Sequence, residues 1–318
     1  MTKAKKFISE QSALVAFVAL LLLSIILRGG TFLSLNNIIN ILRNNSIVGI
    51  IALGMTMIII TGGIDLSVGS MLVIGGMVTL LVINATGSIL LGITTALVVG
   101  VLMGLFSGVL VAKAKIPAFI VTLGTMRIYR SLAQHFLNGG GLLVKGDSMN
   151  SYIAISNTNL FGWLPLPIIY WLVLALMVHL FMKYTPTGRH IYAVGSNEKA
   201  TMLSSINVNR VKIITYVIAS VLVCIAAVVE TSRLGSINSA SSGTNYEMDA
   251  IAAVVIGGTS MSGGRGKIFN TVLGTLTLGI INNMLNLMGV PPFLVGVVKG
   301  AIIIGAVLLQ KGLDKENA

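Results

Sequence analysis

Long apolar runs recur along nearly the whole chain, and they constrain its fold more than any other feature. Of the 318 residues, 55% are hydrophobic and only 9% are charged, against roughly 25% charged residues in an ordinary soluble domain. A helix needs about 17 to 25 apolar residues to cross the hydrocarbon core of a bilayer, and many runs reach that length. The shorter alternating segments of a transmembrane β-barrel are absent. The sequence therefore predicts an all-α, polytopic transmembrane helical bundle.

The charged residues orient these spans. We expect about 10 spans, at about 13–28, 38–61, 66–84, 88–112, 117–137, 164–183, 210–232, 247–262, 267–287 and 293–310. An even count places the N and C termini on one side, and Lys3, Lys5 and Lys6 before the first span assign that side to the cytoplasm. Most of the 21 Lys and Arg residues then lie in cytoplasmic segments. This bias, together with contacts to membrane lipid, accounts for the formal net charge of +12. The charge therefore does not indicate nucleic acid as a partner.

The spans form one predicted transmembrane domain, residues 1–318, with two repeat-like halves at about 38–137 and 210–310. The first half contains IIITGGIDLSVGSMLVIGGM, and the second half contains AAVVIGGTSMSGGRGKIFNTVLG. In both, a hydrophobic helix ends in Gly-Gly, a polar turn with serine follows, and a helix rich in small residues resumes. Irregular backbone at membrane depth is tolerated only where protein or a water-filled cavity satisfies it. Interrupted segments at matching positions therefore indicate a substrate path.

Polar residues at these interruptions are candidates for the translocation path or its gate. Gly62 and Gly63 can end one helix, which makes Asp65 the expected N-cap of the next helix, accepting hydrogen bonds from the amides of Ser67 or Val68. A buried carboxylate in a membrane tends to be functional, so capping and a role in the path both stay open. The further candidates, on the ninth span, are Asn282, Asn283 and Asn286. For these, hydrogen bonds between helices are the alternative to lining the path.

Other polar and small residues in the spans have structural interpretations. Thr244 to Glu247 fits a capping box that opens the eighth span, and Asp249 follows in the first turn, where the helix dipole favours it. Lys299 is expected to extend toward a polar region rather than to line a pore. Small-x-x-x-small steps allow close helix packing, either within the chain or between two chains. They occur at Gly100, Gly104 and Gly108, and at Gly296 and Gly300.

The sequence contains no motif for catalysis or nucleotide binding. A phosphate-binding loop of the G-x-x-x-x-G-K-[ST] type would need a glycine where Met261 stands and a hydroxyl residue where Ile268 stands. With 9 acidic residues, little acid–base chemistry is available. The histidines are too scattered to indicate a metal site. The chain is therefore expected not to be an enzyme and to hold no cofactor or metal.

The longest polar stretch on the predicted cytoplasmic side is the loop 184–209 between spans six and seven. Asn197 can cap a short helix from Glu198 to Ser205, and Ile206 and Val208 then close the loop. Such a shallow helix is suited to docking a partner. The alternative is a solvated loop that carries positive-inside charge.

This loop resembles the coupling loop in permeases of ATP-binding-cassette importers, specifically the ribose-type monosaccharide family. The matching positions are Gly195, Asn197, Glu198, Ala200, Ser204, Ile206 and Val208. GGIDLSVGS is likewise typical of that family, and YEMDAIAAVVIGGTSMSGGRGKI, residues 246–268, matches its second-half signature. The chain departs from the family at Ser205, where glycine is usual, and at Thr201, where a small residue such as alanine is common.

The resemblance implies a non-catalytic, multi-pass permease subunit of the bacterial cytoplasmic (inner) membrane. In such importers a second permease chain completes a homodimer, and an ATP-binding-cassette ATPase subunit, which holds ATP and Mg, docks on the coupling loops. A solute-binding protein delivers a monosaccharide, here ribose or a related pentose or hexose. One alternative is a secondary transporter driven by an ion gradient, with Asp65 or Glu230 as the coupling carboxylate. Another is a scaffold or channel, although the sequence has no selectivity-filter signature.

Overall fold

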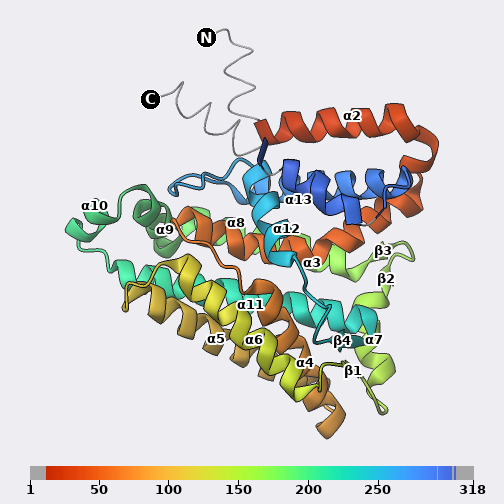
Figure 1. Cartoon of the computed structure of the whole chain (residues 1–318), viewed down its shortest axis with the longest axis horizontal. Coiled ribbons are helices and arrows are strands. Elements are labelled where there is room, and N and C mark those ends of the chain that lie inside the picture. Colours follow the sequence, from red (N-terminus) through yellow and green to blue (C-terminus); the bar gives the residue numbers. More distant parts are fainter. Residues whose placement is uncertain (1–11, 292, 303, 306–318) are drawn as a thin grey trace.

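The computed structural model of the protein describes residues 12–291, 293–302 and 304–305. Long helices run roughly lengthwise along the molecule, with short connections at both ends (Figure 1). The helices are α2 (Ser12–Phe32), α3 (Leu35–Ile60), α4 (Val68–Thr86), α5 (Ile89–Ala112), α6 (Ala118–Phe136), α7 (Met149–Asn157), α8 (Leu166–Tyr184), α9 (Pro186–Ser196), α10 (Glu198–Leu203), α11 (Val208–Leu234), α12 (Tyr246–Ile256) and α13 (Ile268–Leu287). A further short apolar helix covers Phe293–Ile302. The strands are β1 (Gly141–Leu143), β2 (Asn159–Leu160), β3 (Leu164–Pro165) and β4 (Ser236–Asn238).

Seven of these helices are long and apolar enough to cross a membrane: α2, α3, α4, α5, α8, α11 and α13. Helix α6, also predicted as a span, has a suitable length of 19 residues but carries Arg127 and Arg130 in its middle. The eighth predicted span, 247–262, is wrong in length. Helix α12 has only 11 residues and ends before Gly257, so it covers about 16 Å, half of the hydrocarbon core. The end of the tenth span lies outside the described residues, and the count of ten stays a prediction.

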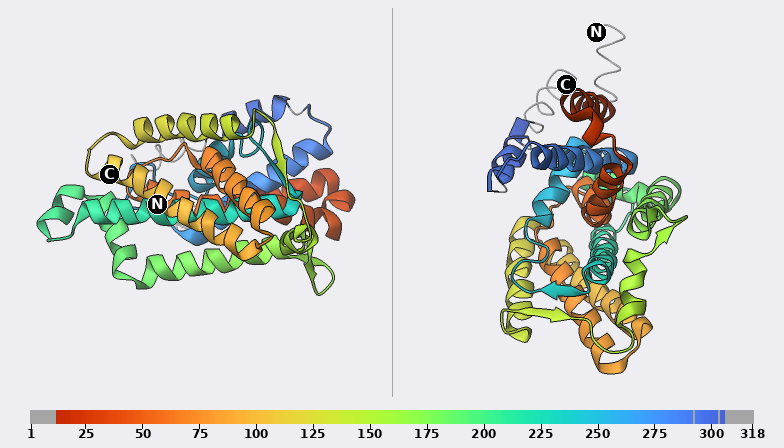
Figure 2. Two further views of the ribbon diagram at one scale, coloured as in Figure 1. Left: turned by 90° about the horizontal axis from the view of Figure 1, so that it is seen from below. Right: turned by 90° about the vertical axis from the view of Figure 1, so that its right-hand side faces the viewer.

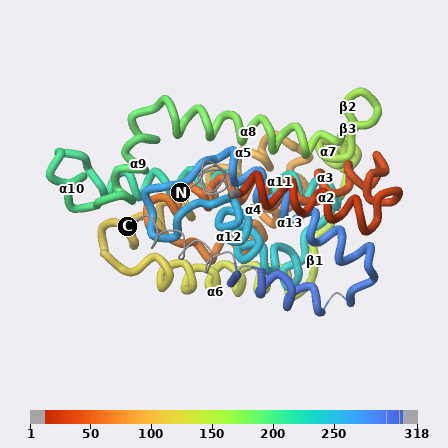
Figure 3. Tube along the Cα trace, turned by 90° about the horizontal axis from the view of Figure 1, so that it is seen from above, coloured from red at the N-terminus to blue at the C-terminus, as the bar shows by residue number. Residues whose placement is uncertain are grey.

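The core lies around α3, α4 and α11. Every residue of α3 from Gly49 to Ile60 is buried, and α11 packs against α3, α4 and α5. Helix α8 lies on one side of this centre and α6 on the other (Figure 2 and Figure 3). Because α3 is enclosed by other helices on all sides, this stretch is apolar all round rather than striped, apart from Thr56, whose hydroxyl is hydrogen-bonded.

Three glycines set the close packing of α5 on α11. A Cβ at Gly104 would lie 2.6 Å from the Cα of Val217, and a Cβ at Gly108 would lie 3.0 Å from the Cα of Ile213. A Cβ at Gly100 would lie 2.9 Å from Cys224 Sγ. These three glycines therefore serve packing within the chain. Within the described part of the chain, a Cβ at Gly296 or Gly300 meets no atom within 4 Å, so the role of that second step stays open.

Two small antiparallel sheets, which the all-α prediction did not include, join connections at the end of the molecule opposite α10 (Figure 1). Strand β1 pairs with β4, with Gly141 opposite Asn238, and β2 pairs with β3. The strands have two or three residues each. Segments this short carry no alternating pattern, so nothing in the sequence indicated them.

The expected capping box at Thr244 does not form. Helix α12 begins at Tyr246, its N-cap is Asn245 at a φ of 66°, and no side chain caps it. The left-handed conformation of Asn245 turns Thr244 away from the helix, and the Thr244 hydroxyl donates to the Ala240 carbonyl at 3.4 Å. The side chain of Lys299 has a partner within the protein: its Nζ lies 2.8 Å from Asp249 Oδ1.

Candidate functional site

The connection between α3 and α4 is shaped by Gly62 and Gly63, as the sequence predicted. Gly62 has a φ of 83°, a left-handed conformation that glycine adopts without strain. The Gly63 amide donates to the Ile58 carbonyl at 3.0 Å, and the Gly62 amide donates to the Ile59 carbonyl at 2.9 Å. These bonds satisfy the last carbonyls of α3 and end the helix.

Asp65 lies buried in this connection, with 1% of its surface exposed. The N-cap of α4 is Ser67 and not Asp65, so the predicted capping position is wrong. The carboxylate binds just ahead of the helix: Oδ1 accepts from the Ser67 amide at 2.8 Å and from the Ser67 hydroxyl at 2.5 Å. Oδ2 has no hydrogen-bond partner among the described residues. A buried carboxylate that is only half satisfied is costly, which keeps Asp65 a candidate functional residue.

Three further polar side chains from separate helices lie in the same region and were missed by the sequence analysis. Tyr129 of α6 and Tyr216 of α11 both interact electrostatically with Asp65, and Ser107 of α5 lies beside Tyr129. The side chains of Tyr129 and Ser107 are within hydrogen-bonding reach of each other. The Tyr216 hydroxyl, like Asp65 Oδ2, is buried without a hydrogen-bond partner within the described ranges. The only sequence signal was a hydroxyl group inside each apolar span.

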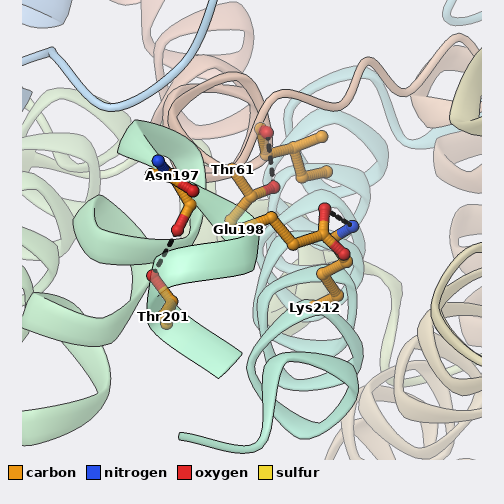
Figure 4. A network of polar contacts seen from close by, with 6 residues as sticks. Thr61, Asn197, Glu198, Thr201 and Lys212 are labelled. Atoms are coloured by element: carbon orange, nitrogen blue, oxygen red, sulfur yellow. Dashed lines mark hydrogen bonds and ion pairs between the residues drawn. The ribbon is translucent and has the colours of Figure 1, made fainter. Parts of the chain in front are cut away.

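The loop 184–209 contains the capped helix that the sequence predicted. The Ala200 amide donates to Asn197 Oδ1 at 2.9 Å, and the Thr201 hydroxyl donates to the Asn197 carbonyl at 2.7 Å (Figure 4). Helix α10 ends at Leu203, two residues earlier than expected. Ser205, where glycine is usual in the family it resembles, has a φ of 61°. This left-handed conformation gives the physical reason for a glycine at that position.

Helix α10 is fixed on its inner side and exposed on its outer side. Glu198 pairs with Lys212 of α11 at 2.8 Å (Figure 4), and Thr201 is buried. On the outer side, Leu203 is 88% exposed and Met202 is 55% exposed. Of the other predicted coupling residues, Ala200 and Ser204 are exposed, Ile206 packs partly buried against the core, and Val208 is buried at the start of α11.

The loop also meets both interrupted segments at one backbone junction. A Cβ at Gly195 of α9 would overlap the Ile60 carbonyl oxygen and lie 2.6 Å from the Gly264 amide nitrogen. That amide donates to the same Ile60 carbonyl at 2.9 Å. Nearby, the Tyr192 hydroxyl donates to the Gly266 carbonyl at 2.9 Å, and burial raises the pKa of Tyr192, which keeps it neutral. Three motifs far apart in the sequence therefore touch through Ile60, Gly195 and Gly264.

A cavity of about 260 Å³ opens between this end of α3 and the α10–α11 turn. Its walls come from the α3–α4 connection, the α5–α6 connection, α10 and α11. The lining residues are Thr61, Gly62, Gly63, Val111, Lys115, Ile116, Pro117, Ala118, Glu198, Lys212 and Tyr216. The Glu198–Lys212 ion pair thus lies beside the two glycines that end α3.

Comparison with known proteins identifies the family. The family model described as the permease component of the branched-chain amino acid transport system matches residues 37–307. The chain belongs to this permease family. The permease is 40% identical over 314 residues to the ribose import permease protein RbsC of Escherichia coli (strain K12), covering 96% of this chain and 95% of the relative. The resemblance to ribose-type importer permeases is therefore confirmed.

Two further relatives are permeases of other sugar transport systems in the same organism. The L-arabinose transport system permease protein AraH is 36% identical over 248 residues, 77% of this chain and 74% of the relative. The D-allose transport system permease protein AlsC is 34% identical over 290 residues, 89% of this chain and 86% of the relative. No solved structure matches the chain. The family and the candidate spans make the permease a multi-pass protein of the cytoplasmic (inner) membrane.

The asparagines of α13 do not join the Asp65 region of the permease. Asn283 and Asn37 of α3 exchange amide hydrogen bonds of 2.7 and 3.1 Å. For Asn283 this is the hydrogen bond between helices that the sequence analysis gave as the alternative to lining the path. Asn286 is exposed. Asn282 Oδ1 is a buried atom with no hydrogen-bond partner in the described part of the permease. Since Asn37 lies near the start of the 26-residue α3 and Asp65 follows its end, the two predicted groups are separate.

Proposed function

We propose that the permease is the transmembrane subunit of an ATP-driven importer and forms the path for a monosaccharide, ribose or a related pentose or hexose. The sugars named for its relatives support this substrate class. The observation that carries the proposal is the junction of Ile60, Gly195 and Gly264. It connects the loop on which a partner would act to both interrupted segments. A transport path that is driven by a separate ATPase subunit requires such a connection.

The partners follow from what the chain contains. It has no phosphate-binding loop, so ATP and Mg belong to an ATP-binding-cassette ATPase subunit, and the permease itself needs no cofactor. The outer side of α10, with Met202 and Leu203 exposed, is the docking surface proposed for that subunit. A solute-binding protein delivers the sugar at the opposite end, and a second copy of the permease completes a homodimer.

Motion of α10 would reach the membrane helices by two routes. One is the Glu198–Lys212 ion pair, which links α10 directly to α11. The other runs through α9, because Gly195 lies against the Ile60 carbonyl and the Gly264 amide. Both routes end beside Gly62 and Gly63, and so beside the segment that holds Asp65. Contacts this close transmit displacement because packed backbone cannot be compressed.

A secondary transporter driven by an ion gradient is the alternative, and two buried carboxylates favour it. Asp65 is 1% exposed and Glu230 of α11 is 2% exposed, and each has one oxygen without a hydrogen-bond partner among the described residues. Glu230 is also bonded by the side chain of Tyr246. Ionisable groups inside a membrane often carry coupling protons or ions.

The test is a crosslink between α10 and the ATPase subunit. In a Cys224→Ser background, a cysteine at the exposed Ala200 should crosslink to the co-expressed ATPase, and the yield should change when ATP is added. A cysteine at Glu198 is a second probe, at the cost of the ion pair with Lys212. Phe161, 80% exposed in the β2–β3 turn, is the matched control position and should give no crosslink. Labelling of Ala200→Cys from outside intact cells by an impermeant thiol reagent would refute the assignment.

A further inference from the structure

A second polar cavity, of about 220 Å³, lies where α4, α6 and α12 meet. Its polar lining includes two arginines and a carboxylate, and none of these residues was a candidate for the path in the sequence. The lining residues are Ser70, Met126, Arg127, Arg130, Gln134, Ala240, Thr244, Asn245 and Glu247. The cavity is therefore walled by α6, by the beginnings of α4 and α12, and by the connection that precedes α12. Helices α4, α6 and α12 are labelled in Figure 1.

The fold builds this cavity by starting two helices side by side within the bundle. A Cβ on Gly69, in the first turn of α4, would overlap the carbonyl oxygen of Gly243. A Cβ on Gly243 would likewise overlap the carbonyl oxygen of Gly69. The two backbones therefore touch. The side chains of the two N-cap residues, Ser67 and Asn245, make no capping hydrogen bond to the helices that follow them. Adjoining helices that begin inside the bundle are the arrangement in which transporters bind their solutes.

The cavity extends from the middle of α6 toward its C-terminal end and opens at the surface of the chain, where Arg127, Gln134 and Thr244 are exposed. Arg127 lies about 13 Å from each end of the 19-residue α6, and Arg130 lies about 9 Å from its C-terminal end. With α6 as a span, the depth of Arg127 is close to the centre of a hydrocarbon core of about 30 Å. Charged side chains at such depth are costly unless they face a polar cavity or a partner, and they mark solute paths.

The polar groups offer both donors and acceptors. The Arg130 guanidinium donates to the carbonyls of Ser239 and Ser242 at 3.1 and 2.8 Å, which fixes its plane. Glu247 interacts electrostatically with Arg130, so the two charges offset each other. Gln134 and Thr244 add uncharged donors and acceptors. A volume below the roughly 300–1,000 Å³ of pockets for drug-sized ligands suits a small solute. The chemistry that fits is a molecule with several hydroxyl groups, which can accept from the Arg127 guanidinium and donate to the Glu247 carboxylate.

We propose that this cavity is an intramembrane binding site for a monosaccharide on its way through the permease. Arg127, Gln134 and Glu247 contact the sugar hydroxyls, and the bonds to Ser239 and Ser242 hold Arg130 as a fixed part of the wall. The inference rests on the proposed transport function and adds to it the place at which the sugar is held in the permease. It makes α6 and the start of α12 part of the path.

Protection of a cysteine from labelling tests the site directly in the full-length chain. Thr244→Cys, in a Cys224→Ser background in lipid nanodiscs, should react with a small water-soluble thiol reagent. D-ribose should slow the reaction in proportion to occupancy, about tenfold at about ten times its Kd. The control Ala200→Cys, on α10, should react at a rate that the sugar does not change. No labelling of Thr244→Cys, or an equal rate with and without D-ribose, L-arabinose and D-allose, overturns the proposal.

Filling the cavity gives an independent test in the assembled complex. Gln134→Trp places a large ring in the cavity and should abolish sugar uptake while assembly and ATP hydrolysis persist. Ser131→Trp, an exposed position on the same helix outside the cavity lining, should transport like wild type. Equal uptake by the two variants overturns the proposal. If wild type itself shows no ATP-driven uptake, the proposed transport function fails, and cysteine protection then decides on the cavity alone.

Discussion

Asp65 combines a satisfied and an unsatisfied carboxylate oxygen in one buried side chain. Oδ1 accepts two hydrogen bonds from Ser67. These bonds close a turn that fixes the backbone just before α4. Oδ2 has no partner among the residues that the structure describes, and neither does the hydroxyl of Tyr216 in the same region. The structural role therefore belongs to Oδ1, and the predicted role in the path or gate rests on Oδ2 and on the charge.

Asp65→Asn should separate these two roles. Its amide oxygen can accept both bonds from Ser67, so we expect thermal stability, assembly and uptake close to those of wild type. Asp65→Ala removes the acceptor and leaves the Ser67 amide and hydroxyl buried and unpaired, which should cost about 1–3 kcal/mol of stability. Thermal unfolding in detergent and uptake by the reconstituted complex measure the two effects. Asp147→Ala, at an exposed position, is the control. A stable, assembled Asp65→Asn complex without uptake would mean that the charge itself is required.

Ser205 is a residue whose backbone conformation suits a different amino acid. At a φ of 61°, a residue with a Cβ is strained and glycine is not. Ser205→Gly should therefore raise the free energy of unfolding by about 1 kcal/mol. Ser204→Gly is the matched control, because Ser204 has a φ of −82° and donates to the Ala200 carbonyl. Chemical denaturation compares the two, and equal stabilisation by both substitutions would contradict the explanation.

Among the elements, those set by local signals were predictable from sequence. Gly62 and Gly63 end α3, and Asn197 caps α10, because such bonds form within one helical turn. The length of α12 was overestimated because the residues from Gly257 to Ser262 are small or uncharged, and hydropathy does not register that the helix has ended. The Gly195 junction and the polar cavity were not predictable. Each depends on contacts between segments far apart in the sequence, which no local pattern specifies.

The junction makes α9 sensitive to a single methyl group. Gly195→Ala would place a Cβ against the Ile60 carbonyl and the Gly264 amide, and backbone atoms cannot move aside cheaply. Overpacking of this kind costs about 1–3 kcal/mol, and the displaced α9 should lower the amount of sugar transported per ATP hydrolysed. Gly124→Ala, on α6, is the control, since its Cβ would meet no described atom within 4 Å. Wild-type stability and coupling in Gly195→Ala would show that the junction transmits nothing.

At the scale of the whole molecule, the functional features follow one another along the long axis. Helix α10 lies at one end and the paired strands β1 and β4 lie at the other (Figure 1), and the polar cavity extends from the middle of α6 toward the β1–β4 end. The buried core of α3 and α11 connects the α10 end with the interior. A push on α10 therefore has a continuous packed route to the helices that border both Asp65 and the cavity.

The last prediction concerns the source of energy. The chain lacks a phosphate-binding loop, and a neutral sugar gains nothing from the membrane potential, so the purified permease in proteoliposomes should neither hydrolyse ATP nor accumulate sugar. Adding the ATPase and the binding protein should restore both activities, with uptake that stops when ATP is withheld. The control is the same complex with Gln134→Trp, which should hydrolyse ATP without uptake. Asp65 is 1% exposed, and this enclosure argues against free exchange of protons or ions from solution. Sustained accumulation by the permease alone under a proton or sodium gradient would establish the secondary-transporter alternative instead.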